Sequence, residues 1–330
     1  MKIPSATKPL ALTEKLFHLF KERNDVVIQK HSLVYKKGEY DFLKVSSKDI
    51  APNDPVLLIR AGIHGDEISG PITIERHGNE IFDYAHKRGV KVILYPLDNP
   101  SGFVKERRYN IDNDAGWDPH RKGKNKRTGN NAFLHYELED GSIKDDIRDG
   151  NIKFRRFMWS SDPSLGIHLP IETQLMHKLL KEDPLSQVKA SLDLHQDFIT
   201  PNAPPAAYQY VLGNIEAYKP ITQEVSKICQ LYKNQLMESG YEVETNENGV
   251  VIGNPIKSGA MEISDEDGSI VRYDGSLTDL FYRLGTPYNV AVETTGATPL
   301  NTACQVNLIW IQGLIDLIQK NSINDKRQEA

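Results

Sequence analysis

Two short apolar runs constrain the fold of this chain more than any other feature of its sequence. Residues 55–61 (PVLLIRA) and 90–97 (VKVILYPL) have the length of strands, and helix-compatible sequence from about Glu67 to Lys87 separates them. A strand that is apolar along its length is typical of parallel sheets that are covered by helices on both faces. The pattern therefore predicts an α/β protein with three layers, helix, sheet and helix.

Further elements extend this pattern along the chain. Residues 26–46 are interrupted by a Lys-Lys-Gly-Glu turn and predict an antiparallel pair of strands. We expect more strands at 189–194, 207–212 and 288–292, and helices near 171–182, 216–238, 276–284 and 301–320. The polar stretch 113–169 is too long for a simple loop and is interpreted as an insertion or a lid. Residues 1–330 are thus predicted to form one domain with that insertion.

Charge and composition exclude several classes of protein. The formal net charge of -5 argues against a general nucleic-acid-binding protein. The basic segment 121–127 (RKGKNKR) is interpreted as a solvated run of charges. Cys229 and Cys304 are too far apart in sequence for a zinc knuckle or a redox pair. Because the chain lacks a signal-peptide core and an apolar run of transmembrane length, we expect a cytoplasmic protein that binds no membrane.

A histidine and a glutamate follow the first apolar strand. In the segment AGIHGDE, His64 and Glu67 are three residues apart at the expected start of a helix, a spacing that puts both side chains on one side. Ligands of open α/β sheets gather at the carboxyl ends of the strands. The pair is therefore a candidate for binding one metal ion, although His-x-x-Glu alone is common.

A second histidine ends another apolar strand. His195 closes the segment SLDLH, and together with His64 and Glu67 it completes a His, Glu, His set that is usual for catalytic zinc with one position left for water. A metal-binding imidazole needs an orienting partner, and either Asp193 or Asp197 is close enough in sequence to accept the second ring proton of His195. Each histidine alone also has a structural interpretation.

Glu293 lies where a third apolar strand, YNVAVE, meets a Gly-containing turn. A carboxylate at the end of a buried strand needs a partner, because its desolvation is costly. Beside a metal-activated water, Glu293 is suited to accept a proton and pass it to a leaving nitrogen. The alternatives are a salt bridge or a helix cap.

An Asn-Pro-x-Gly turn follows the strand at 90–97, and two arginines come soon after it. Asn99 and Gly102 belong to this turn, and Arg107 and Arg108 emerge near the same edge of the sheet. A fixed positive charge there can stabilise the oxyanion that forms when water adds to a carbonyl. Either arginine could instead be a surface cation.

These four motifs, in this order, resemble the zinc carboxypeptidase superfamily, which includes the carboxypeptidase A-like enzymes and the succinylglutamate desuccinylase and aspartoacylase branch. The resemblance covers about residues 55–296. It implies a phosphorylase/hydrolase-like, mixed but mostly parallel sheet of about eight strands. It also implies one Zn²⁺ per chain on His64, Glu67 and His195, with Glu293 as the general base and Arg108 or Arg107 polarising the scissile carbonyl.

Two further positions extend the resemblance, and one departs from it. Family members carry a mobile tyrosine before a Gly-Ser pair, and Tyr273 is the candidate here, with a packing aromatic as the alternative. Asn113 is the candidate for half of the Asn-Arg pair that binds a substrate carboxylate, but Asp114 follows it in place of arginine. Arg155, Arg156 or another cation of the insertion would have to replace that arginine.

The sequence therefore predicts a zinc hydrolase of amide bonds, carboxypeptidase-like, acting on a small peptide or peptide-like substrate. An N-acyl amino acid deacylase, as in the desuccinylase and aspartoacylase branch, is the alternative within enzymes. A non-catalytic binding protein on the same fold is the alternative from another class. The pattern leaves the oligomeric state open.

Overall fold

The computed structural model describes residues 9–121, 126–145, 147, 152–198, 203–232, 236–238 and 261–328. Its strands within these residues are β1 (Val26–Tyr35), β2 (Gly38–Ser47), β3 (Val56–Ala61), β4 (Lys91–Tyr95), β5 (Leu134–Leu138), β6 (Ile143–Lys144), β7 (Phe154–Trp159), β8 (Val188–Leu194), β9 (Ala207–Gly213), β10 (Leu236–Glu238), β11 (Met261–Ile263), β12 (Ser269–Val271) and β13 (Tyr288–Thr294). Its α-helices are α1 (Pro9–Lys21), α2 (Ser69–Lys87), α3 (Pro100–Val104), α4 (Ile171–Glu182), α5 (Lys219–Ser226), α6 (Leu277–Arg283) and α7 (Leu300–Gln328).

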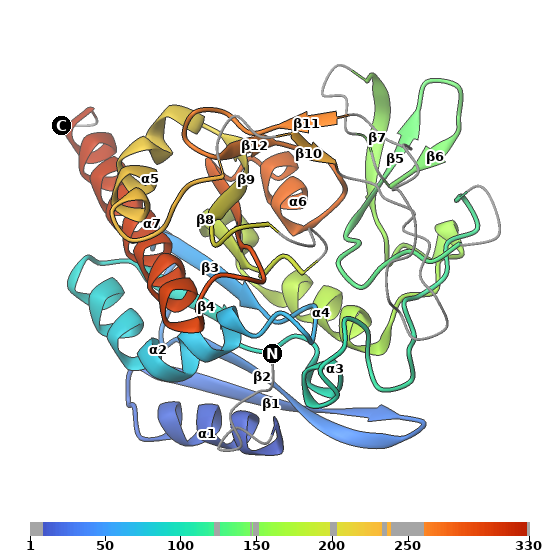
Figure 1. Ribbon diagram of the computed structural model, residues 1–330, viewed down its shortest axis with the longest axis horizontal. Coiled ribbons are helices and arrows are strands. Elements are labelled where there is room, and N and C mark those ends of the chain that lie inside the picture. The colour runs from blue at the N-terminus through green and yellow to red at the C-terminus, as the bar shows by residue number, and fades with distance from the viewer. Residues whose placement is uncertain are drawn as a thin grey trace.

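The central sheet has eight strands in the order β1-β2-β4-β3-β8-β13-β9-β12 (Figure 1). Strands β4, β3, β8 and β13 run parallel to one another, and β12 is parallel to β9. The pairs β1/β2, β2/β4 and β13/β9 are antiparallel. The sheet is thus mixed, with the parallel strands at its centre, as the sequence predicts.

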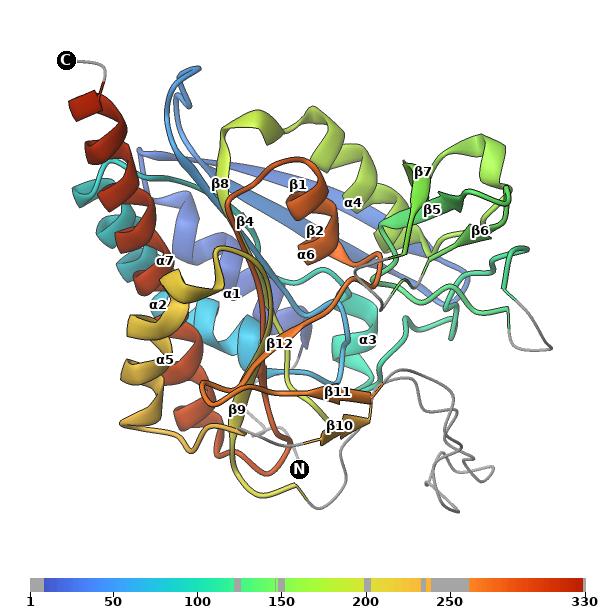
Figure 2. The ribbon, with the colours of Figure 1, turned by 90° about the horizontal axis from the view of Figure 1, so that it is seen from above.

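Helices cover both faces of this sheet, and the layers are visible from above in Figure 2. One apolar cluster joins the sheet to α1, α2, α5 and α7, through residues such as Leu16, Ile81 and Trp310. A second cluster joins the other face to α4, α6 and β5, through residues such as Met176 and Phe281. The predicted three-layer α/β/α fold class is confirmed.

The polar stretch 113–169 contains structure of its own. Its described residues form a three-stranded antiparallel sheet in the order β6-β5-β7, which projects from one side of the molecule in Figure 1. Phe133, Leu134 and Tyr136 are fully buried in the second apolar cluster. This part of the insertion therefore contributes to the core. In the basic segment 121–127, residues 122–125 lie outside the described residues.

One predicted helix is wrong over much of its length. A helix was expected at 216–238, but α5 ends at Ser226 and residues 236–238 form β10, with 233–235 lying outside the described residues. After a turn, Leu231 forms a parallel bridge with Ala207 of β9. The backbone amide of Ala207 donates to Gln230 and that of Tyr232 donates to Ala207. Pairing with the sheet thus overrides the local helical pattern.

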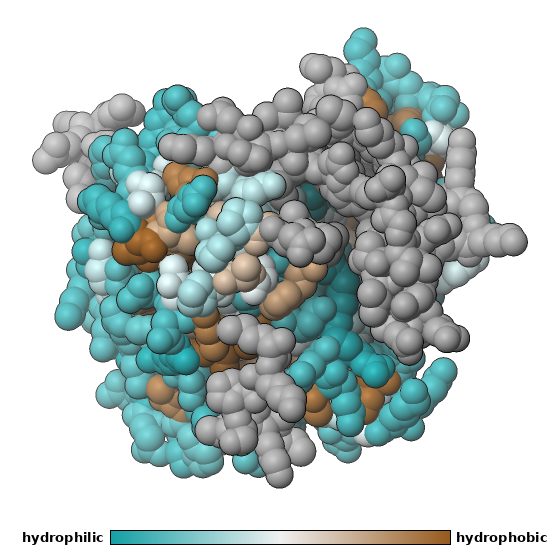
Figure 3. Space-filling model, in the orientation of Figure 1, coloured by the Kyte–Doolittle hydropathy of each residue, from teal (hydrophilic) through white to brown (hydrophobic). Residues whose placement is uncertain are grey.

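The coloured surface in Figure 3 is mostly hydrophilic, with separate hydrophobic areas. Exposed large apolar side chains, such as Val34 and Trp117, are distributed over several elements. None of the described helices combines the length and the apolar character that crossing a lipid bilayer requires.

Candidate active site

The carboxyl ends of three adjacent parallel strands bring the predicted residues together. Because β3, β8 and β13 are neighbours in the sheet, the residues that follow or end them meet at one edge. His64 lies three residues after Ala61, the last residue of β3, while His195 follows β8 directly and Glu293 is near the end of β13. Motifs that are more than 200 residues apart in sequence, at 64 and 293, thus converge.

His64 and Glu67 lie on a turn that two glycines make possible. Gly62 has a φ of +68°, a left-handed conformation that favours glycine. Gly65 packs so closely against the next loop that a Cβ atom would lie 2.1 Å from the carbonyl carbon of Gly102. The amide of Glu67 donates to the carbonyl of His64 at 3.2 Å. Helix α2 begins only at Ser69, so a turn and not the expected helix start sets the spacing of the pair.

Asn99 of the Asn-Pro-x-Gly turn connects two segments. One is the turn that carries His64 and Glu67 (the histidine turn), and the other is the loop after α3 that carries Arg107 and Arg108 (the arginine loop). The side-chain amide of Asn99 donates to the carbonyls of Ile63 at 3.3 Å and Arg108 at 3.1 Å. Its side-chain oxygen accepts from the amide of Gly102 at 2.8 Å and caps α3. Asn130 of the insertion donates to the same two carbonyls. Two buried amides therefore fix the histidine turn against the arginine loop.

His64, Glu67 and His195 form one compact buried group. The Nδ1 atom of His64 lies 2.7 Å from Oε1 of Glu67, and Nδ1 of His195 lies 2.7 Å from Oε2 of the same carboxylate. Their candidate ligand atoms all lie within 4.8 Å of one another, and none of the three residues is more than 5% exposed. Sequence reasoning selected these three residues, and the fold brings them together.

Burial and neighbouring charges together shift the pKa values of this group. Burial would raise the pKa of Glu67, but the two histidines hold that pKa well below its usual range. Burial, followed by the positive charge of Arg108, lowers the pKa of His64 to about 4. For His195, burial acts to lower the pKa, yet Asp193, Glu67 and Glu293 raise it well above its usual value. The site thus keeps an ionised carboxylate beside a neutral His64.

Asp193 is the orienting partner of His195. Its Oδ2 atom lies 3.1 Å from Nε2 of His195, which leaves Nδ1 directed toward Glu67. Asp197, the other candidate, accepts a hydrogen bond from the buried Tyr208 hydroxyl at 2.9 Å. A carboxylate that holds the second ring nitrogen is the usual arrangement around a metal-binding histidine.

Glu293 borders the group with a carboxylate that is only partly engaged. Its Oε1 atom lies 3.9 Å from Nδ1 of His195, and its side chain is 13% exposed. Its Oε2 atom is buried and has no hydrogen-bond partner among the described residues. Burial raises the pKa of Glu293 well above its usual value, and Glu67 and Asp197 add to this effect against the opposing charge of His195. The two structural alternatives for Glu293, a salt bridge through Oε2 and a helix cap, therefore do not explain its position.

The two arginines of the fourth motif have different surroundings. The guanidinium NH1 of Arg108 donates to Oε1 of Glu67 at 3.1 Å, and its side chain is 33% exposed. Arg107 is exposed. Only Arg108 therefore reaches the group, which distinguishes two candidates that the sequence could not separate.

Within the described part of the chain, Tyr273 and Asn113 contact residues other than the His64, Glu67 and His195 group. The ring of Tyr273 lies 5.8 Å from that of Tyr282, and the guanidinium of Arg283 lies 4.9 Å from its centroid. Asn113 is exposed and has a φ of +58°. Its backbone amide donates to the carbonyl of Asn110 in a turn. The structure thus packs Tyr273 in an aromatic cluster, and the substrate-binding roles of both residues stay predictions.

Among the described residues of the insertion, Arg127 is an exposed cation close to the loop that carries Arg108. Arg155 and Arg156 both pair with Glu137 on the small sheet. Arg127 lies with its guanidinium 5.6 Å from the ring centroid of Tyr109, the residue that follows Arg108. Asp114, which stands in place of the expected arginine, pairs with His168 at 3.0 Å.

A second group of possible ligands lies in the insertion. Asp118, His135 and Asp145 have candidate ligand atoms within 4.8 Å of one another. Arg121 already donates to Asp145 at 2.8 Å and lies 3.8 Å from Asp118, while Nδ1 of His135 is bonded to Ser160. An arginine thus supplies the positive charge of this group, which we interpret as a partly buried ion-pair network.

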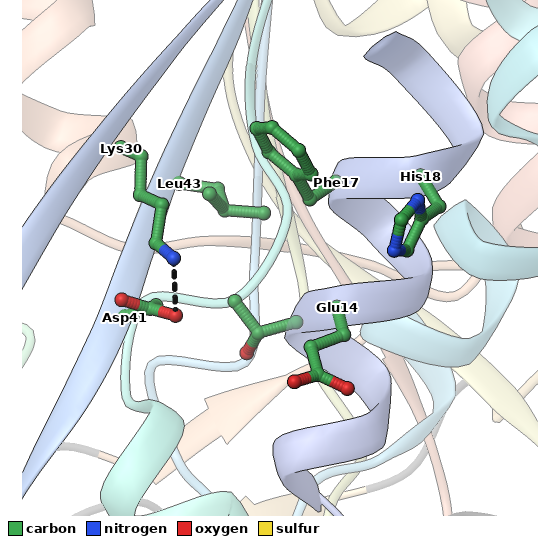
Figure 4. A pocket seen from close by; sticks show the side chains of 7 residues that line it. Glu14, Phe17, His18, Lys30, Asp41 and Leu43 are labelled. Atoms are coloured by element: carbon green, nitrogen blue, oxygen red, sulfur yellow. Dashed lines mark ion pairs between the residues drawn. The ribbon is translucent and has the colours of Figure 1, made fainter.

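A pocket of about 300 Å³ lies away from the predicted residues, between α1 and the β1/β2 hairpin (Figure 4). Lys30 and Asp41 line it and pair with each other at 2.8 Å. None of the predicted site residues lines this pocket. The candidate residues therefore lie at the edge of the sheet and not in this pocket.

The donor set fits zinc. Two imidazoles and one carboxylate have candidate ligand atoms within 4.8 Å of one another, and Nδ1 of each imidazole faces the carboxylate of Glu67. Two histidines and one carboxylate form a common catalytic zinc site, in which an open position remains. Asp193 supplies the hydrogen-bonded support that such a site requires.

Solved structures with the same fold are metallopeptidases and related proteins. A protein of Shewanella baltica OS155 assigned as a metallopeptidase is 16% identical, with a TM-score of 0.59 over 94% of this chain and 92% of that chain. Bovine thrombin-activatable fibrinolysis inhibitor, solved with tick carboxypeptidase inhibitor, is 14% identical, with a TM-score of 0.51 over 96% and 98% of the two chains. Carboxypeptidase A of Helicoverpa armigera is 13% identical, with a TM-score of 0.50 over 94% and 70%.

The chain therefore has a carboxypeptidase-like fold. Within it, residues 53–114 match the succinylglutamate desuccinylase/aspartoacylase catalytic domain. This segment includes His64, Glu67 and Arg108. The fold and the matched segment together confirm the resemblance that the motifs indicated. No curated protein matches the sequence of this chain.

Proposed function

We propose that this protein is a zinc-dependent hydrolase that cleaves an amide bond of a peptide or peptide-like substrate. The observation that carries the proposal is the free, buried Oε2 atom of Glu293 beside the His64, Glu67 and His195 group. A carboxylate with a raised pKa, next to a convergent set of metal ligands, is suited to proton transfer.

In this proposal, His64, Glu67 and His195 bind the metal, and Glu293 transfers protons. A zinc ion held by His64, Glu67 and His195 would supply Lewis acidity to water and to a carbonyl. Glu293 accepts the proton of the attacking water and then delivers it to the leaving nitrogen. Asp193 keeps His195 in one orientation throughout, because its carboxylate holds Nε2.

Arg108 is proposed to stabilise negative charge on the carbonyl oxygen. Its guanidinium is fixed by Glu67 at 3.1 Å, yet a third of its side chain is exposed. A positive charge that is already positioned costs little reorganisation when an oxyanion forms.

Arg127 is proposed to bind a substrate carboxylate. In the carboxypeptidase pattern an arginine does this, but Asp114 stands at that position in this chain. For R127Q we expect a raised KM only for substrates with a free carboxylate, and equal KM changes for amidated substrates would contradict this.

An N-acyl amino acid deacylase is the second candidate. The match of residues 53–114 to the succinylglutamate desuccinylase/aspartoacylase catalytic domain favours it. The chemistry would be unchanged, because both reactions cleave an amide bond with water. Only the substrate pocket would differ.

One set of assays tests both candidates. Protein depleted of metal with a chelator is reloaded with zinc, and initial rates are measured on short peptides and on N-succinyl, N-acetyl and N-formyl amino acids. The main proposal predicts zinc-dependent release of an amino acid from peptides, and the second candidate predicts release from acylated amino acids only. If no amide is cleaved by zinc-loaded protein, the protein is a binding protein and both proposals fail.

A further inference from the structure

An arginine is fully buried at the centre of the sheet, beneath the candidate site. Arg60 belongs to β3, and its side chain is 0% exposed. In the parallel register between β3 and β8, Arg60 is opposite Asp193. Because paired residues of neighbouring strands project to the same face, Arg60 and Asp193 share the face that the insertion covers. The guanidinium lies 4.7 Å from the ring centroid of Phe133 of that insertion.

Two carboxylates compensate the charge of Arg60. The Nε atom donates to Oδ2 of Asp98, which follows β4, and NH1 lies 3.4 Å from Oδ2 of Asp193. Asp98 and Asp193 are 1% and 3% exposed. Burial of an ion is costly unless it is paired, so these three charges depend on one another.

The same Asp193 atom connects Arg60 to the candidate metal ligand. Oδ2 of Asp193 lies 3.4 Å from Arg60 and 3.1 Å from Nε2 of His195. Its Oδ1 atom has no hydrogen-bond partner among the described residues. The position of this carboxylate therefore rests on its two charged neighbours, Arg60 on one side and His195 on the other.

We propose that Arg60 is a positioning residue for the metal site, which acts on His195 through Asp193. Asp98 anchors the guanidinium, the guanidinium fixes Asp193, and Asp193 holds Nε2 of His195 so that Nδ1 faces Glu67. The inference rests on the zinc site of the proposed function. Without Arg60, Asp193 keeps only His195 as a partner for its buried charge, and its carboxylate holds the imidazole less firmly.

The test measures zinc affinity of the apoprotein by competition with a chromophoric chelator. We expect R60M to bind zinc about tenfold or more weakly than the wild type, as removal of a partner behind a metal ligand does. R60K retains the charge and should recover most of the affinity. In the D193N background, R60M should add no more than a factor of about two, because the path through Asp193 is already lost.

A matched control separates this role from simple stability. Lys44 is also a buried cation and forms an ion pair with Asp183. Among the described residues, neither member of this pair contacts a candidate metal ligand. K44M should therefore leave zinc affinity at the wild-type value, although it lowers the thermal midpoint. If R60M does not fold, R60Q takes its place, because glutamine also removes the charge beside Asp193 but can still form hydrogen bonds in the buried site.

Three results would overturn the inference in distinct ways. Folded R60M with wild-type zinc affinity removes Arg60 from the metal site. An equal loss on adding R60M to the wild type and to D193N shows that Arg60 does not act through Asp193. A loss in K44M as large as in R60M shows a general effect of stability. Failure of the wild type to bind zinc would instead contradict the proposed function itself.

Discussion

The Oε1 atom of Glu293 lies 3.9 Å from Nδ1 of His195, while the other oxygen of this carboxylate is buried without a hydrogen-bond partner among the described residues. A buried carboxylate oxygen normally has a partner. Because Glu293 lies beside three candidate metal ligands, we interpret its unpaired oxygen as available for proton transfer. In the proposed mechanism, this relationship separates Glu293, which transfers protons, from the three residues that bind the metal.

The substitution E293Q should remove catalysis and keep the metal. Glutamine occupies the same volume but cannot accept a proton, so kcat should fall by about 100-fold or more. Zinc content is measured on the same preparation. Undiminished turnover by E293Q, with zinc present, would exclude Glu293 as the general base.

The two adjacent arginines should behave differently. Arg108 contacts Glu67, so R108Q should lower kcat/KM by about 100-fold, in line with the loss of one oxyanion-stabilising group. R107Q is the matched control, and its kcat/KM should stay near the wild-type value because Arg107 is exposed. Equal losses in the two variants would contradict the assignment.

A methyl group at Gly65 should disrupt the histidine turn. The Cβ atom of alanine would lie 2.2 Å from the amide nitrogen of Phe103, so the loops must separate. G65A should lower both zinc affinity and the thermal midpoint. The control is G89A, where the φ is +68° but no atom lies within 4 Å of the Cβ position, and a cost of about 1 kcal/mol is expected from the backbone alone. Similar zinc affinity in G65A and the wild type would show that the close packing is dispensable.

Glu172 should make stability depend on pH. Burial raises its pKa to about 7, although Asn110 and Tyr35 hydrogen-bond its carboxylate. As the pH rises, Glu172 loses its proton near pH 4.5 in the unfolded state but keeps it until about pH 7 in the folded state. The contribution of this group is fully present below pH 4.5 and is lost as the pH rises through 7.

The variant E172Q isolates this effect. Between pH 5 and pH 8, the wild-type apoprotein should lose about 2 to 3 kcal/mol of unfolding free energy relative to E172Q, as urea denaturation would measure. The glutamine has no charge to bury at either pH. A difference between the two proteins that is the same at both pH values would contradict the raised pKa.

The parallel centre of the fold was predictable because its signals are local. An apolar strand such as β3 must be buried on both faces, and a His or Glu at its end then lies at the ligand-binding edge. Glu293 and His195 were found in this way. The same reasoning missed Arg60, whose presence within an apolar run was a signal of a buried partner. Its partners are distant in sequence, Asp193 in β8 and Asp98 in the segment after β4, so only the tertiary fold reveals them.

Other features depend on tertiary context that local sequence does not contain. The chain after Ser226 has a helical pattern, yet Leu231 pairs with the edge of β9. Arg107 and Arg108 are adjacent and chemically identical, and only the path of the loop directs Arg108 toward Glu67. Tyr273 occurs in a motif like that of a mobile loop, but it packs against Arg283.

The zinc content of purified protein, wild type and E67Q side by side, tests the central claim most directly. Because Glu67 lies 2.7 Å from both histidines, its replacement should destroy the site while the rest of the fold stays intact. A zinc site on these residues predicts one zinc per wild-type chain and almost none in folded E67Q. A wild-type protein without zinc, or equal zinc in both proteins, would contradict it.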